Sequence, residues 1–231
     1  MRSSKKPSRS RGGLVIFFDV DNTLLNNDGV LKDVRAYLKR EVGERRAMRY
    51  WRIFEDLREE LQYADYLGAL QRYRCQYPHD VHLLQVAHFL LEYPFEKRLY
   101  RDSLKVIQRA HRWGTVALLS DGDVVFQPRK VLRSGLAKAV RGCVLIYVHK
   151  QDQLHDARKR FPADHYVVVD DKLHILAAIK KIWGKKVTTV FVRQGHYAFD
   201  PKIISSNPPA DLTIEGIGDL LSFERRDLIP A

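Results

Sequence analysis

Short apolar runs recur along this chain, and each is bounded by turn-forming or charged residues. The first covers residues 14–18, and four more cover 115–119, 144–148, 166–169 and 187–192. Apolar runs of this length with such boundaries predict buried strands. Segments of helical periodicity separate the later runs. Strands that alternate with helices in this way indicate a doubly wound parallel sheet.

The stretch between the first two predicted strands has a different pattern. Residues 30–100 contain no convincing strand, and apolar residues recur there with the spacing of one helix face. Two such series are Leu31, Val34, Leu38 and Val42, and then Tyr50, Phe54, Leu57 and Leu61. Pro78 and Pro94 end two further helical patterns. We therefore expect an all-helical segment inserted between the first strand and the rest of the sheet.

Composition narrows the class of protein. The 231 residues suit one large α/β domain, or a core with a smaller inserted domain. No apolar run approaches the roughly 18 residues of a membrane-spanning helix, and no secretory signal is recognisable. With only two cysteines, neither a disulfide framework nor a structural zinc site is expected. We expect a cytoplasmic protein without a membrane partner.

The charge is strongly positive, with 40 Lys and Arg against 28 Asp and Glu, or +12. Residues 1–12 form a basic tail rich in Ser, Gly and Pro, which predicts disorder. Such a tail can contact nucleic acid electrostatically, although a solubilising role is the interpretation we favour. The remaining positive charge is spread along the chain and suits an anionic substrate without specifying one.

Polar side chains stand where the predicted strands end. They are Asp19 and Asp21 after the first strand, Ser120 after the second, Lys150 after the third, and Asp170 and Asp171 after the fourth. The carboxyl ends of parallel strands meet at one edge of a sheet, so these groups should converge. Carboxylates from two strands make an oxygen site for Mg²⁺. A hydroxyl and an ammonium can bind phosphoryl oxygens, and one carboxylate can attack as a nucleophile.

In this order, the motifs resemble those of the haloacid dehalogenase-like superfamily of Mg²⁺-dependent phosphohydrolases. The first motif, Asp-x-Asp-x-Thr, matches Asp19 to Thr23, and the Ser, Lys and acidic-pair motifs match Ser120, Lys150 and Asp170-Asp171. The resemblance covers about residues 13–221. It implies an α/β fold with a three-layer Rossmann-like parallel sheet core and an inserted all-helical cap domain. The domains it implies are a core at 13–25 and 101–231 and a cap at 26–100.

The resemblance also implies a role for each motif residue. Asp19 would be the nucleophile and a metal ligand. Asp21 would be the general acid and base, and its backbone carbonyl would also bind the metal. Asp171, with Asp170, would complete the Mg²⁺ site. Substrate binding would fall to Thr23, Ser120, Asp121, Gly122 and Lys150, and catalysis to Asp19, Asp21, Ser120 and Lys150.

Two assignments stay open at this point. Many members of the superfamily have Gly at the position of Asp170, so the metal ligand could be either residue of the pair. Lys130, ten residues after Ser120, competes for the lysine role. We favour Lys150 because it follows a strand directly, whereas Lys130 is predicted to lie on a helix. The loop at 193–197 is a further candidate for contact with substrate or cap.

The function favoured by the sequence is hydrolysis of a small phosphate monoester through an aspartyl-phosphate, with Mg²⁺ as cofactor. Haloacid dehalogenases lack a suitable acid at the position of Asp21, because a halide leaves without a proton. One alternative is a nucleic-acid end-processing phosphatase or nucleotidase that uses the basic tail and cap. Another is a non-catalytic phospho-ligand binding or signalling module, although phospho-receiver domains are shorter and lack a helical insert. The sequence leaves the physiological substrate and the oligomeric state open.

Overall fold

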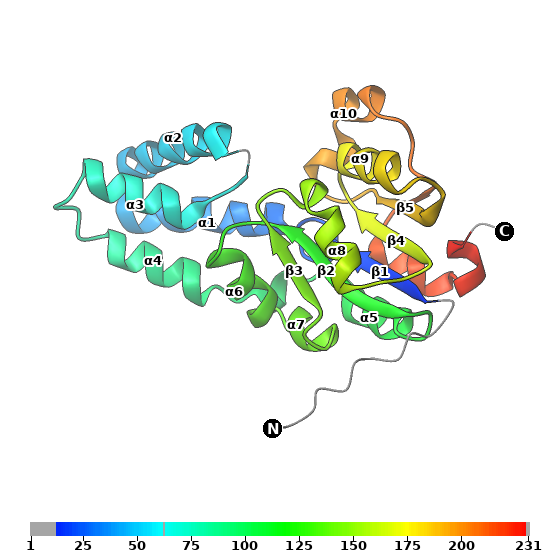
Figure 1. Ribbon diagram of the computed structural model, residues 1–231. Helices are drawn as coiled ribbons and strands as arrows, with labels where there is room; N and C mark the ends of the chain where they lie inside the picture. The colour runs from blue at the N-terminus through cyan, green and yellow to red at the C-terminus, as the bar shows by residue number, and fades with distance from the viewer. Residues whose placement is uncertain (1–12, 62, 230–231) are drawn as a thin grey trace, which may run out of the picture.

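A parallel sheet forms the centre of the computed structural model, which describes residues 13–61 and 63–229 (Figure 1). Its strands are β1 (Leu14–Phe18), β2 (Thr115–Asp121), β3 (Val144–Tyr147), β4 (His165–Asp170), β5 (Val187–Val192) and β6 (Leu212–Ile214). The strand order is β3-β2-β1-β4-β5-β6, and every neighbouring pair is parallel. The predicted parallel sheet is therefore confirmed. The order reverses between β1 and β4, which is where doubly wound sheets place their ligand sites.

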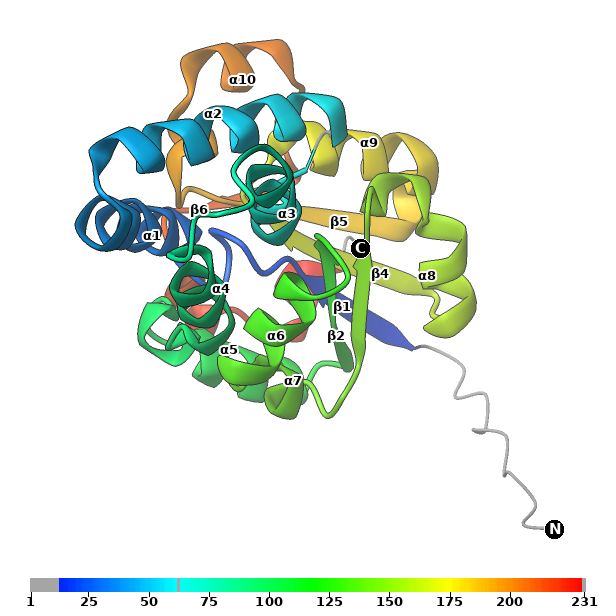
Figure 2. The ribbon, with the colours of Figure 1, turned by 90° about the vertical axis from the view of Figure 1, so that its left-hand side faces the viewer.

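Helices cover both faces of the sheet, giving three layers (Figure 2). One face carries α5 (Ser103–Ala110), α6 (Phe126–Arg133) and α7 (Leu136–Ala139), and the other carries α8 (Leu154–Arg160) and α9 (Leu173–Trp183). The alternation of side chains along each strand explains this division. In β1, Ile16 belongs to the apolar cluster under α5 and α6, whereas Phe17 belongs to the cluster under α8 and α9. Both faces of the strands are thus apolar, as their continuous hydrophobic runs require.

The remaining elements are short. They are α10 (Pro201–Ser206) and the 3₁₀ turns η1 (Phe95–Arg98), η2 (Lys150–Asp152), η3 (Gly184–Lys186), η4 (His196–Phe199), η5 (Ile217–Ser222) and η6 (Arg225–Leu228). Two strands are longer than predicted: β2 extends to Asp121, because Ser120 and Asp121 pair with Ile146 and Tyr147 of β3, and β4 gains one residue at each end. The predicted third strand stops one residue early, and Lys150 therefore lies in η2.

The segment between β1 and β2 is helical, as predicted. Its helices are α1 (Asn27–Val42), α2 (Glu44–Leu61), α3 (Tyr66–Gln76) and α4 (Leu83–Glu92), and they form the helical cap at the left of Figure 1. They lie beyond the carboxyl ends of the strands. The division into domains at 13–25 with 101–231 and at 26–100 stays a prediction, and the predicted basic tail at 1–12 lies outside the described residues.

Two neighbouring backbone segments join the cap to the sheet. Leu25 and Leu99 form an isolated antiparallel bridge. Asn26 N donates to Arg98 O at 2.7 Å, and Tyr100 N donates to Leu24 O at 3.0 Å. We call these paired segments, residues 24–26 and 98–100, the hinge. The chain therefore leaves and re-enters the sheet domain at one place.

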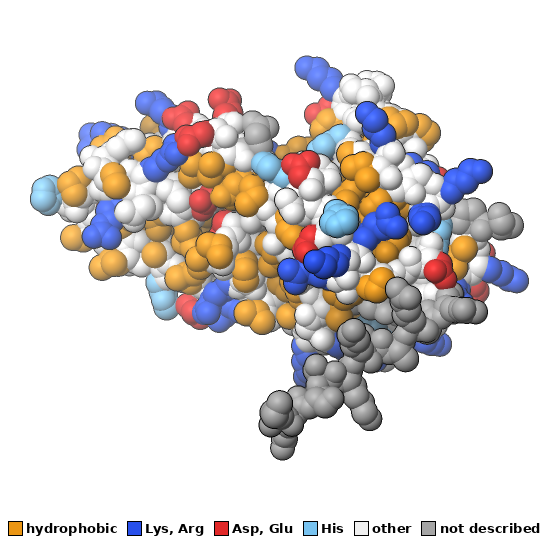
Figure 3. Space-filling model, viewed as in Figure 1, with side chains coloured by type: hydrophobic (Ala, Val, Ile, Leu, Met, Phe, Trp, Pro, Cys, Tyr) orange, Lys and Arg blue, Asp and Glu red, His pale blue; other side chains and the backbone are white. Residues whose placement is uncertain are grey.

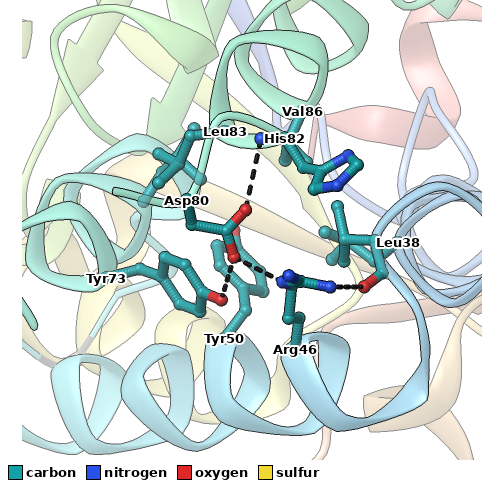
Figure 4. Close-up of a pocket in the computed structure, with 10 residues that line it drawn as sticks. Leu38, Arg46, Tyr50, Tyr73, Asp80, His82, Leu83 and Val86 are labelled. Carbon is teal, nitrogen blue, oxygen red and sulfur yellow. Dashed lines mark hydrogen bonds and ion pairs between the residues drawn. The ribbon is translucent and has the colours of Figure 1, made fainter. Parts of the chain in front are cut away.

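A partly buried carboxylate links the helices of the cap to one another (Figure 4). Asp80, between α3 and α4, accepts hydrogen bonds from Tyr73 Oη at 2.8 Å and from His82 N at 3.2 Å. Arg46 Nε of α2 lies 2.7 Å from the same carboxylate. Burial alone would raise the pKa of Asp80, but these three partners outweigh it and lower the pKa below its ordinary value.

We expect Asp80→Asn to lower the free energy of unfolding at pH 7 by about 1–3 kcal/mol, because it weakens a charged hydrogen-bond network. A carboxylate with a lowered pKa stabilises the fold above its unfolded pKa, near 4, and this contribution disappears as the pH falls through the folded value. The difference between wild type and variant should therefore shrink at pH 3. Urea unfolding at both pH values measures it, with the exposed Asp56→Asn as control. A constant difference would contradict this account.

Basic side chains are distributed over the surface. In Figure 3, Lys and Arg are spread over both the cap and the sheet domain on the face shown, with acidic side chains among them. Within residues 13–61 and 63–229, the helices are too short or too polar to cross a membrane.

Candidate active site

Three carboxylates meet where β1 and β4 end. Asp19 follows β1 directly, and its backbone N donates to Val169 O of β4 at 2.9 Å. Asp170 is the last residue of β4, and Asp171 follows it. All three side chains are buried, and one oxygen from each lies within 4.8 Å of the others. The parallel pairing of β1 with β4 thus brings together acids that are far apart in the sequence.

Lys150 lies between two of these carboxylates. Its Nζ is 2.5 Å from Asp19 Oδ1 and 2.6 Å from Asp170 Oδ2, and its side chain is only 1% exposed. Its backbone N donates to Asp121 Oδ1 at 2.6 Å, which fixes η2 against the end of β2. Of the two lysines that the sequence left in competition, Lys150 is therefore the one beside Asp19.

The carboxylates outnumber the ammonium groups around them. Burial raises the pKa of Asp19 to about 7; Lys150 opposes this rise and Asp170 adds to it. Burial and then Asp170 raise the pKa of Asp171 well above its ordinary value. Burial would lower the pKa of Lys150, but Asp170 and Asp19 outweigh it and raise that pKa well above its ordinary value. Burial is thus the largest cause of the raised pKa at both Asp19 and Asp171, and the neighbouring carboxylate of Asp170 adds to it.

Unpaired oxygens mark where a cation fits. Asp19 Oδ2 and both carboxylate oxygens of Asp171 are buried without a hydrogen-bond partner. Buried polar atoms are normally satisfied, and hard carboxylate oxygens are the ligands that Mg²⁺ prefers. Asp170 Oδ2 also has no hydrogen bond but lies 2.6 Å from Lys150 Nζ, and Asp170 Oδ1 accepts from Lys172 N at 2.9 Å. Asp171 is thus the residue of the pair with both oxygens unpaired, and the assignment of the metal ligand stays a prediction.

The predicted phosphoryl-binding residues lie around this cluster. Ser120 Oγ accepts from Gln127 Nε2 of α6 at 2.9 Å, and Gly122 lies beside the same glutamine. A Cβ on Gly122 would come within 2.5 Å of Gln127, so only glycine fits. Thr23 is fully buried, and its hydroxyl has no partner. Of the predicted substrate-binding residues, Asp121 and Gly122 line the cavity between the cap and the sheet domain, whereas Thr23, Ser120 and Lys150 do not.

The cavity lies between the cap and the sheet domain and has a volume of about 150 Å³. Its cap side includes Phe54, Arg58, Tyr63 and Tyr66, and its other side includes Asp21, Gln127, Lys130, Lys172, His196 and Tyr197. Arg58 on the cap side donates to Tyr197 Oη on the other side. His196 Nδ1 lies 2.7 Å from Asp28 of α1. The predicted contact of the 193–197 loop with the cap is therefore present.

The Asp21 side chain lies outside the three-carboxylate cluster, and Asp21 lines the cavity. Lys130 Nζ donates to its Oδ1 at 2.6 Å and to its Oδ2 at 2.9 Å. Its side chain is therefore absent from the cluster of Asp19, Asp170 and Asp171, and the metal contact predicted for it concerns its backbone carbonyl.

Sequence reasoning did not find the partner of Asp21, but a signal was present. Phe126, Lys130 and Val131 are all buried on α6, at the spacing of one helix face. The apolar residues at 126 and 131 could have placed Lys130 on the inner side of its helix. Asn27 and Asp28 carried no such signal, because their role depends on where the cap lies.

Comparison with known proteins agrees with this geometry. A family model for haloacid dehalogenase-like hydrolases matches residues 14–182. The crystal structure of a haloacid dehalogenase-like hydrolase from Burkholderia xenovorans LB400 is 58% identical, covers 92% of this chain and 99% of that chain, and superposes with a TM-score of 0.89.

Two more distant structures share the fold. An L-2-haloacid dehalogenase from Xanthobacter autotrophicus, with chloropropionic acid covalently bound, is 15% identical over 90% of this chain and 96% of its own, with a TM-score of 0.59. A hydrolase of the same fold from Bacillus subtilis, bound to magnesium, is 13% identical over 91% and 97%, with a TM-score of 0.57. A comparison with functionally curated proteins gives no match.

Proposed function

This chain belongs to the haloacid dehalogenase-like hydrolase family, and from this premise we propose that it is a Mg²⁺-dependent phosphatase of small phosphate monoesters. The observation that carries the proposal is Asp21, a second carboxylate two residues after Asp19 that lines the cavity. An alkoxide leaving group needs a proton, whereas a halide does not. A cavity-lining acid next to the nucleophile therefore favours an ester over a haloacid.

Asp19 is suited to attack phosphorus. Lys150 holds Oδ1 at 2.5 Å and so fixes the carboxylate, while the unpaired Oδ2 remains available to a cation. In the proposed first step, a bond forms between Asp19 and phosphorus while the bond from phosphorus to the ester oxygen breaks. Asp21 donates a proton to that oxygen, and the alcohol leaves. The buried ammonium of Lys150 stabilises the negative charge that gathers on the phosphoryl oxygens.

The second step releases phosphate. Asp21, now a carboxylate, accepts a proton from a water molecule that attacks phosphorus. The bond between Asp19 and phosphorus breaks, so both acids return to their starting states. Asp19 and Asp171 would hold Mg²⁺, which would supply the positive charge that lets an anionic carboxylate approach an anionic phosphate. The Ser120 hydroxyl would orient the phosphoryl group.

The size of the cavity supports a small substrate. A volume of about 150 Å³ suits a phosphoryl group with a compact alcohol, rather than a polynucleotide end inside the cavity. The positions that match the four motifs all keep reactive side chains, which supports catalysis over a binding or signalling role.

A direct test compares two chemistries. Phosphate release should be measured over phosphosugars, phosphoacids, nucleotides and phosphorylated oligonucleotides, and halide release over L-2-chloropropionate. We expect phosphate from one of the small esters and no halide. Halide release without phosphate release would overturn the phosphatase assignment and leave the family membership intact.

Metal removal should abolish activity and also change stability. We expect EDTA to stop phosphate release and Mg²⁺ to restore it. A ligand at 100 times its dissociation constant stabilises the folded state by about 2.7 kcal/mol, so Mg²⁺ should also raise the Tm. Asp171→Asn should lose this rise, because it removes the carboxylate with two unpaired oxygens, whereas the exposed Glu96→Gln should keep it. A Tm rise retained in Asp171→Asn would show that Mg²⁺ binds elsewhere.

A further inference from the structure

Lys130 is a buried cation with no part in the mechanism given above. Its residue is 1% exposed, on the inner face of α6. Moving an ammonium group from water into the protein interior costs roughly several kcal/mol of free energy unless anions and hydrogen-bond acceptors surround it. Lys130 has such partners: both oxygens of Asp21, at 2.6 and 2.9 Å, and Asn27 Oδ1 at 3.0 Å.

The other cations of α6 serve different partners. Arg129 and Arg133 both pair with Glu92 of the cap helix α4, at the surface. Their neighbour Lys130 instead turns inward and lines the cavity. The cations of α6 therefore make two kinds of contact: Arg129 and Arg133 pair with Glu92 at the surface, and Lys130 pairs with Asp21 in the interior.

We propose that Lys130 is a positioning residue that fixes the Asp21 carboxylate for proton transfer. An ammonium that contacts both oxygens restricts rotation of the carboxylate. Each oxygen keeps a second lone-pair direction that can face the cavity. Without this cation, the Asp21 carboxylate, whose side chain is 26% exposed, would be repelled by a phosphate dianion and would turn toward solvent. The inference rests on the proposed function and assigns it one further residue.

Asn27 extends this arrangement to the cap. It is the first residue of α1, and its backbone N donates to Asn22 Oδ1 at 3.0 Å. Lys130 therefore contacts both the end of β1, through Asp21, and the start of the cap, through Asn27. The direction of Asp21 is held from the sheet domain and from the cap at once.

The test uses the leaving group as its readout. The esters would be p-nitrophenyl phosphate, whose leaving group hardly needs a proton, and an alkyl phosphate, whose leaving group needs one. We expect Lys130→Met to lower kcat for the alkyl ester about 10- to 100-fold, part of the range for general acid catalysis. For p-nitrophenyl phosphate the rate of the first release of nitrophenol should fall less than about 3-fold, because that step needs no acid, with KM changed little for either ester. Lys138→Met, which removes an exposed lysine of α7, should lose nothing.

A double-mutant cycle separates positioning from a general structural role. In an Asp21→Asn background, Lys130→Met should cause no further loss with the alkyl ester, because the group it positions is gone. Lys130→Gln, which can still hydrogen-bond, serves if Lys130→Met unfolds. Equal losses for both esters in the step that releases the leaving group, or losses that add in the double variant, would overturn the inference. Failure of the underlying phosphatase proposal is distinguishable, because wild type would then hydrolyse neither ester.

Discussion

Asp19→Asn should reduce phosphate release by at least about 10⁴-fold, because an amide cannot form the covalent bond to phosphorus and removal of a nucleophile costs factors of this order. The substitution changes little else. The amide oxygen can still accept from Lys150, which lies 2.5 Å from Asp19 Oδ1. Steady-state release from an aryl phosphate with saturating Mg²⁺ measures the loss.

Stability provides the control for this variant. Burial raises the pKa of Asp19 to about 7, so the folded state carries the cost of a desolvated carboxylate near two others. A neutral amide removes that cost, and we expect the Tm of Asp19→Asn to equal or exceed that of wild type. Glu96→Gln, the same chemical change at an exposed site, should leave activity and Tm unchanged. An Asp19→Asn protein that is folded and still active would refute the assignment of the nucleophile.

Asp21→Asn should have the second largest effect, and its size should depend on the substrate. With an alkyl phosphate we expect kcat to fall about 10²- to 10⁴-fold, the usual contribution of general acid–base catalysis. With p-nitrophenyl phosphate the first step needs no acid, so the loss should be smaller. Release of the alcohol and release of phosphate should therefore be followed separately.

A burst of nitrophenol would identify the step that Asp21 serves. If Asp21→Asn also slows the attack of water, the aspartyl-phosphate should accumulate, with one equivalent of nitrophenol released rapidly before slow turnover. A variant that slows both esters equally, without a burst, would show that Asp21 acts in binding and not as a proton carrier.

The sheet and the convergence of its strand ends could be predicted because both follow from local pattern. A strand such as 14–18 is predicted by its apolar run. Parallel pairing of this strand with the fourth then places Asp19 near Asp171. Lys150 was predictable for the same reason, since it follows β3 within a few residues.

The cavity wall could not be predicted in this way. Arg58 and Tyr197 stand 139 positions apart and meet only because the cap lies over the β5 loop. No periodicity encodes that placement. The pairing of Lys130 with Asp21 was predictable only in part. The helical pattern indicated that Lys130 lies on the inner face of its helix, but it did not indicate that Asp21 is its partner.

The hinge has a consequence for how this fold could change. Leu25 and Leu99 are neighbours in space, so the cap is one long insertion whose two ends lie side by side. The entropy of closing such a loop grows only with the logarithm of its length. Longer, shorter or unrelated inserts at this point would therefore cost the sheet domain little, provided that they cover the apolar surface now shared with α1. Recombination at this point could therefore exchange the cap while the strand ends and their carboxylates stay as they are.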